Sequence, residues 1–124
     1  MASDAVIDLV RRYLNLLRQE GFQVDRAVLF GSQARDDAHS DSDIDLLITS
    51  TDFETLTWQQ EERLWSLTAR LDSRLEPIPC SESHWRADVV SPLIEAARLE
   101  GIVIHRDSRV RVYPAREEFT QVAP

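Results

Sequence analysis

The first twenty residues alternate apolar and polar positions at the spacing of a helix. Apolar side chains recur every three or four residues, which places them along one face of the helix and the charged side chains on the other. Ser3 or Asp4 is suited to cap the first turn, and Gly21 is suited to stop the last one. We therefore expect a first helix that packs through Val6, Ile7, Val10, Tyr13, Leu14 and Leu17.

Shorter apolar runs predict the strands of a sheet. Apolar runs of this length are typical of buried strands. They cover residues 24–30, 44–49 and 102–105. A further short strand is expected over 74–78, where Pro77 and Pro79 interrupt the pattern. Because proline has no N–H to donate to a neighbouring strand, this strand is expected at an edge or an end of the sheet.

Three further helices complete the predicted pattern. A short helix begins at Ser32 or Gln33, a long one covers about 58–72, and a third has Pro92 in its first turn and ends at Gly101. The long helix is expected to turn one face inward, formed by Leu64, Trp65, Thr68 and Leu71. The fold class is therefore α/β (or α+β), with a small mixed sheet flanked by helices. Residues 1–107 form one domain in this prediction, and 108–124 form an extended arm or tail.

The positions of the three tryptophans allow two interpretations. Trp58 and Trp65 lie seven positions apart on the long helix, so they share a face. We expect both of them, and Trp85, to lie in the core. The alternative is an exposed pair on the helix that anchors a partner protein.

Composition narrows the class of protein. The chain has 124 residues and a formal net charge of −8. Such acidity argues against a large nucleic-acid interface, because phosphate binding needs lysine and arginine. The single cysteine, Cys80, excludes an internal disulfide. Neither a signal peptide nor a membrane span is visible, so a cytoplasmic protein with no membrane partner is expected.

The most informative pattern is Gly31-Ser32 followed, after ten residues, by Asp43-Ile44-Asp45. A Gly-Ser turn that closes a strand offers backbone N–H groups to a phosphate. The two acids lie on one face of the next strand, about 7 Å apart, and can share a divalent metal ion. A phosphate grip beside paired carboxylates indicates metal-assisted phosphoryl or nucleotidyl transfer.

The two runs that contain this pattern, 30–35 and 42–46, resemble the signature of the DNA polymerase β-like nucleotidyltransferase superfamily. The length resembles its smallest branch, the minimal nucleotidyltransferases, and the resemblance covers roughly residues 5 to 106. It implies a polymerase β-like fold, two Mg²⁺ ions and ATP as the nucleotide donor. Members of this branch are often antitoxins of HEPN-type ribonuclease toxins, and some transfer AMP to a tyrosine of the toxin.

The resemblance also implies roles for individual residues. Asp43 and Asp45 would bind metal and act in catalysis, while Gly31, Ser32 and Arg35 would bind the triphosphate. The family has a third carboxylate on a neighbouring strand, which binds metal and accepts the proton of the acceptor. Its best match is Glu76, a glutamate where aspartate is commoner, and the alternatives in this chain are Asp72 and Glu82.

Three functions fit these observations. The leading one is a Mg²⁺-dependent nucleotidyltransferase that acts as an antitoxin and transfers AMP from ATP to a tyrosine hydroxyl of a HEPN-type toxin. The second is an antitoxin that neutralises its partner by binding alone. The third is a small-molecule enzyme of the aminoglycoside nucleotidyltransferase type. Direct nucleic-acid binding is not expected, and either a homodimer or a hetero-oligomer is compatible with the sequence.

Overall fold

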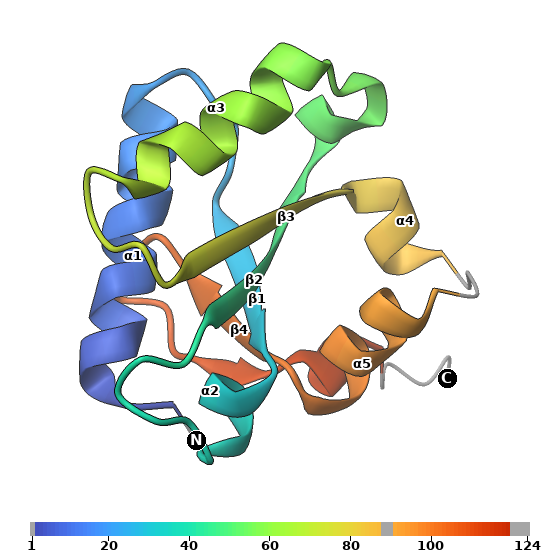
Figure 1. The fold of residues 1–124 in the computed structure, drawn as a ribbon. Coiled ribbons are helices and arrows are strands. Elements are labelled where there is room, and N and C mark those ends of the chain that lie inside the picture. Colours follow the sequence, from blue (N-terminus) through green and yellow to red (C-terminus); the bar gives the residue numbers. More distant parts are fainter. Residues whose placement is uncertain (1, 88–90, 120–124) are drawn as a thin grey trace.

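The computed structural model describes residues 2–87 and 91–119, and Figure 1 shows how the elements are arranged. Five strands form one mixed sheet in the order β3-β2-β1-β4-β5. β1 runs antiparallel to β2 and β4, β5 runs antiparallel to β4, and β2 runs parallel to β3. The strands are β1 (Arg26–Phe30), β2 (Ile44–Ser50), β3 (Leu75–Ser81), β4 (Ile102–His105) and β5 (Tyr113–Pro114).

Helices cover both faces of this sheet. α1 and α3 lie on one face and α4 and α5 on the other (Figure 1). The predicted class, a small mixed sheet flanked by helices, is confirmed. None of the helices in the described part of the chain has the length and apolar character needed to span a bilayer. The helices are α1 (Asp4–Gln19), α2 (Ser32–Arg35), α3 (Trp58–Thr68), α4 (Glu82–Arg86) and α5 (Pro92–Glu100), with 3-10 turns η1 (Thr51–Thr55) and η2 (Ala115–Phe119).

Alternation along β2 divides the apolar side chains between two cores. Ile44, Leu46 and Ile48 pack into the core beneath α1 and α3. Leu47 points to the opposite face and packs into the smaller core beneath α4 and α5. Since side chains alternate along a strand, Asp45 shares the face of Leu47. The fold therefore places the predicted metal-binding carboxylate on the side of the sheet covered by α4 and α5.

α1 follows the sequence prediction closely. Ser3 is the cap, and its side chain accepts a hydrogen bond from the N–H of Val6 at 3.2 Å. Five of the six residues expected on the inward face are buried, and the sixth, Ile7, packs at the edge of the core. The Tyr13 hydroxyl donates to the carbonyl of Leu64 in α3 at 2.7 Å, which joins the two helices on this face.

α3 differs from the prediction in its inward face and in its length. The helix ends at Thr68 rather than near residue 72, and it buries Leu64, Leu67 and Thr68. Trp58 and Trp65 are 69% and 42% exposed, so their expected place in the core is wrong. The reason is geometric: Trp65 lies about 100° around the helix from Leu64, outside the stripe that faces the sheet. The third tryptophan, Trp85, is fully buried, as expected.

β3 occupies an edge of the sheet, as its two prolines predicted, but it continues to Ser81 rather than ending near residue 78. Pro77 and Pro79 are two positions apart, so both direct their ring nitrogens to the same side of the strand. On an edge strand that side faces away from the neighbouring strand, and the missing N–H groups cost no ladder bonds. The full seven-residue pairing with β2 is thereby kept.

The segment after residue 108, expected as an extended arm or tail, packs on the sheet over part of its length. Tyr113 pairs with Val103 of β4, and Ala115 of η2 is completely buried. β5 has only two residues, which is too short for an alternating pattern to identify it in the sequence. A domain boundary at residue 107 stays a prediction, and residues 120–124 lie outside the described residues.

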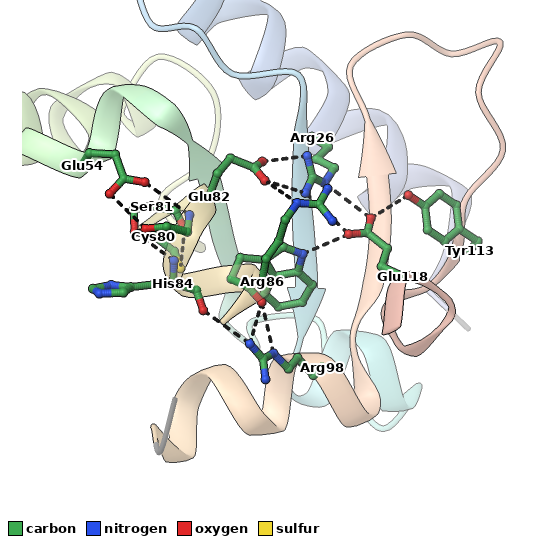
Figure 2. Close-up of polar contacts among 12 residues, drawn as sticks. Arg26, Glu54, Cys80, Ser81, Glu82, His84, Arg86, Arg98, Tyr113 and Glu118 are labelled. Atoms are coloured by element: carbon green, nitrogen blue, oxygen red, sulfur yellow. Dashed lines mark hydrogen bonds and ion pairs between the residues drawn. The ribbon is translucent and has the colours of Figure 1, made fainter. Parts of the chain in front are cut away.

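A partly buried polar cluster joins this segment to the rest of the protein (Figure 2). The Glu118 carboxylate accepts hydrogen bonds from the Trp85 indole at 3.0 Å and the Tyr113 hydroxyl at 2.7 Å. Arg26 of β1 lies between Glu118 and Glu82 and forms ion pairs with both. Burial alone would raise the pKa of Glu118, but these hydrogen bonds and the arginine charge outweigh it and hold the pKa below its ordinary value.

Candidate active site

Three carboxylates from two adjacent strands meet on the face of the sheet that α4 and α5 cover, and we call this side the carboxylate face. Asp45 in β2 lies opposite Phe30 of β1 on one side and opposite Glu76 of β3 on the other. Asp43 is exposed and lies one residue before β2. Both aspartates lie near enough to the Glu76 carboxyl group to raise its pKa. The structure thus brings together the three acids that the sequence proposed.

The surroundings of Glu76 disfavour its charged form. Partial burial, a hydrogen bond with Asp45, and the negative charges of Asp43 and Asp45 raise the pKa of Glu76 from 4.5 to about 7. Three carboxylates gathered in this way repel one another at neutral pH. A bound cation relieves such repulsion, and perturbed carboxylates of this kind are frequent at functional sites.

The two alternative third acids have other partners. Asp72 accepts hydrogen bonds from the backbone and guanidinium of Arg74, at 2.9 to 3.0 Å, which lower its pKa. Glu82 forms ion pairs with Arg26 and Arg86. Of the three candidates, the structure therefore places Glu76 beside Asp45.

Gly31 follows β1 and makes the turn next to Asp45. Its φ is +76°, a conformation that side chains rarely adopt. A Cβ atom at this position would lie 2.5 Å from Oδ2 of Asp45. The sequence explained this glycine by the close approach of a phosphate, but in the structure the neighbour that excludes a side chain is the Asp45 carboxylate. Ser32 follows as the first residue of α2.

The donors of this turn hold a carboxylate that the sequence analysis missed. The backbone N–H of Gly31 donates to Oε1 of Glu100 at 3.2 Å. The Arg35 guanidinium donates to both Glu100 oxygens, at 3.1 and 3.3 Å. Glu100 is the last residue of α5 and lies 69 positions from Gly31, with no local motif to link the two. The Gly31 N–H and the Arg35 guanidinium thus converge on one carboxylate, and their role in binding a triphosphate stays a prediction.

The donor set suits a hard divalent cation, which prefers carboxylate oxygens. Among the described residues, no group of three or more His, Cys, Asp or Glu side chains is arranged so that it could hold a metal ion by itself. This does not conflict with the acid cluster, because Mg²⁺ is usually bound by one or two carboxylates together with phosphate oxygens of the substrate. The residues therefore fit a metal ion shared with a nucleotide better than a closed protein site.

Comparisons with known proteins agree with this chemistry. Residues 10–106 match the family model of the nucleotidyltransferase domain. A candidate nucleotidyltransferase from Sulfolobus solfataricus is 18% identical, with a TM-score of 0.51 over 64% of this chain and 69% of that one. A toxin–antitoxin with AMP-PNP is 21% identical, with a TM-score of 0.58 over 83% of this chain and 75% of that one. No curated protein matches the sequence. The likeness to these structures shows a polymerase β-like nucleotidyltransferase fold.

Proposed function

The chain belongs to the nucleotidyltransferase domain family, and on this basis we propose that it transfers AMP from ATP to a tyrosine hydroxyl of a HEPN-type ribonuclease toxin, for which it acts as the antitoxin. The observation that carries the proposal is the position of Asp45. It lies between an anion-holding turn at Gly31 and a second carboxylate at Glu76. A similar fold in a toxin–antitoxin with AMP-PNP supports both the donor and the class of partner.

The proposed reaction uses the site in two parts. The Gly31 N–H, the Ser32 hydroxyl and the Arg35 guanidinium bind the outer phosphates of ATP in place of the Glu100 carboxylate. Asp43, Asp45 and Glu76 would hold Mg²⁺, which when bound neutralises charge on the α-phosphate and on the departing pyrophosphate. The turn and the carboxylates together fix the α-phosphorus over β2.

The bond changes are those of a substitution at phosphorus. The tyrosine oxygen forms a bond to the α-phosphorus, and the bond from that phosphorus to the bridging oxygen of pyrophosphate breaks. Pyrophosphate leaves with the electron pair of that bond. The proton of the tyrosine hydroxyl passes to a carboxylate, and we assign this role to Glu76. The products are an AMP–tyrosine phosphodiester and pyrophosphate.

Transfer of label tests the proposal directly. The chain is incubated with a purified HEPN-type toxin, Mg²⁺ and ATP labelled at the α-phosphate, and label on the toxin is followed with time. We expect Asp43→Asn to lower the rate by about 100-fold or more, because the metal loses a charged ligand. Asp41→Asn is the matched control, since Asp41 is exposed in the same loop and lies two residues earlier. An unlabelled toxin, or equal rates for Asp43→Asn and the wild type, would overturn the proposal.

A second candidate, an antitoxin that neutralises its partner by binding alone, is favoured by one contact. Glu100 already occupies the donors of Gly31 and Arg35, as it would in a chain that no longer binds a triphosphate. The double variant Asp43→Asn, Asp45→Asn separates the two candidates. Continued protection of cells from the toxin favours binding alone, and loss of protection with an intact complex favours catalysis.

A further inference from the structure

A hollow of about 270 Å³ lies on the carboxylate face, beyond the three acids. Its floor is formed by Leu47 of β2 and Ile78 of β3, and its sides by η1 and by the adjoining ends of α4 and α5. Figure 1 shows α4 directly at the end of β3, with α5 below it in this view. Leu93 is 38% exposed and His84 is exposed, so the hollow is open to solvent at its rim.

The hollow begins where the acid cluster ends. Leu47 follows Asp45 by two residues on β2, and Ile78 follows Glu76 by two residues on β3. Residues two apart on a strand share a face and are separated by about 7 Å. Leu47 and Ile78 are register partners, as are Asp45 and Glu76, so the hollow and the acid cluster are neighbouring parts of one surface.

The direction of the reaction distinguishes the two ends of this surface. In phosphoryl and nucleotidyl transfer the attacking and leaving oxygens lie roughly in line across the phosphorus. Pyrophosphate held at Gly31 departs on the β1 side of Asp45, so the acceptor must enter from the opposite, β3 side. The hollow is lined by β3 from Ile78 to Ser81, by one residue of β2, and by no residue of β1. It therefore lies on the acceptor side.

We infer that this hollow binds the aromatic side chain that carries the acceptor hydroxyl on a partner protein. The inference rests on the proposed function and names the place where its acceptor docks. A volume of about 270 Å³ is just below the range of roughly 300–1,000 Å³ typical of small-molecule sites, so it suits one ring better than a multi-ring aminosugar. Leu47, Ile78, Leu93 and Ile94 offer apolar contact to such a ring.

No Asp, Glu, Lys or Arg side chain of the described residues lines the hollow. Cys80 is buried, and burial raises the pKa of its thiol to about 11, so the thiol is neutral at physiological pH. The His84 ring points away from the cluster around Arg26 and Glu118 (Figure 2). A largely apolar wall with a polar rim matches a phenol ring whose hydroxyl reaches toward Glu76.

The probe for this site is N-acetyltyrosinamide, titrated into the full chain with Mg²⁺ and a non-hydrolysable ATP analogue. N-acetylserinamide serves as a hydroxyl-bearing compound without a ring. Methyl NMR spectra report which side chains respond. We expect the tyrosine compound, but not the serine compound, to shift the methyl signals of Leu93 and Ile94 while those of Leu99 stay in place.

Two matched variants on α5 make the test quantitative. Leu93→Gln removes apolar contact at the rim of the hollow and should weaken binding of the tyrosine compound about fivefold. Leu99→Gln changes a residue that is 66% exposed on the same helix and does not line the hollow, so it should have no effect. Neither variant should change the affinity for ATP.

Three results would overturn the inference. They are equal weakening by both variants, methyl shifts confined to other parts of the chain, and a loss of ATP affinity in Leu93→Gln, which would make the hollow a nucleobase site. Failure of the proposed function gives a different result: ATP does not bind, or a HEPN-type toxin stays unlabelled by the wild-type chain. Toxin labelling that proceeds equally well in Leu93→Gln would contradict the inference alone.

Discussion

Replacing Glu76 by glutamine should stabilise the metal-free protein at alkaline pH, although it removes a proposed catalytic group. Partial burial and the neighbouring Asp45 and Asp43 raise the pKa of Glu76 to about 7, from 4.5 in an ordinary environment. Glu76 therefore holds its proton more tightly in the folded chain than in the unfolded one. Ionisation of Glu76 therefore leaves the free energy of unfolding unchanged below pH 4.5. It lowers this free energy progressively between pH 4.5 and pH 7, and by the full amount above pH 7.

The size of the effect follows from the shift. Each pKa unit corresponds to about 1.4 kcal/mol, which gives an upper bound of about 3.5 kcal/mol for the cost of ionising Glu76. The side chain is partly exposed, and solvent screening reduces this to about 1–2 kcal/mol. For a chain of 124 residues, that corresponds to a rise in Tm of roughly 4–8 °C.

Thermal unfolding of the wild type and Glu76→Gln, with chelator at pH 4.5 and at pH 8, measures this difference. The variant should gain stability at pH 8 and none at pH 4.5, and Glu62→Gln, an exposed substitution in α3, should change neither value. Saturating Mg²⁺ should narrow the gap at pH 8, because it stabilises the wild type more than the variant. A gain that is the same at both pH values, or a lower Tm of the variant at pH 8, would refute the electrostatic reasoning.

Two further predictions concern the other carboxylates. Glu100→Gln removes the negative charge that competes with ATP for Gly31 and Arg35. Calorimetry in the presence of Mg²⁺ should then show ATP binding up to about fivefold more tightly, the size expected from loss of an exposed ion pair. Glu95→Gln, exposed on the same helix, is its control, and unchanged or weaker binding would contradict the competition. Glu118→Gln should lower the free energy of unfolding in urea by about 1–3 kcal/mol at pH 7, because the Trp85 and Tyr113 hydrogen bonds lose a charged acceptor. Glu117→Gln, an exposed neighbour, should have a much smaller effect, and an equal loss in both variants would argue against the buried cluster.

The sequence predicted those elements in which one local signal dominates. The Ser3 cap and the regular apolar spacing after it are sufficient to specify α1, since each residue needs only its neighbours at three and four positions to form the helix face. β3 was predicted at an edge or an end because its two prolines exclude a central strand. It extends to Ser81 because both prolines direct their nitrogens away from β2, so the pairing with β2 is not interrupted. The inward face of α3 was misjudged because Trp65 is as apolar as Leu67, and only packing against the sheet decides between them.

The donor part of the candidate site could be predicted because its residues are close in sequence. Gly31, Asp43 and Asp45 fall within fifteen positions, and a strand, a turn and a second strand are enough to place them together. Glu76 required a parallel pairing of β2 with β3, which no local pattern specifies. It could be chosen from the three acids only because it lies within the predicted strand, whereas Asp72 falls at the end of a helix and Glu82 follows the strand. Glu100 had no signal at all, because its contact depends on how α5 packs beside β1.

The contrast between residues that are close in sequence and residues joined only by packing also explains why the acceptor site could not be predicted. The hollow beyond Glu76 is assembled from η1, β3, α4 and α5, which bring together residues from Leu47 to Ile94 without a shared motif. A triphosphate is the same in every nucleotide, so a short turn and paired acids are enough to bind it. An acceptor differs from one protein to the next, and shape complementarity to it needs walls that only tertiary packing provides. Leu93, at the rim of that hollow, is therefore the position at which a substitution should change the choice of acceptor while leaving ATP binding unchanged.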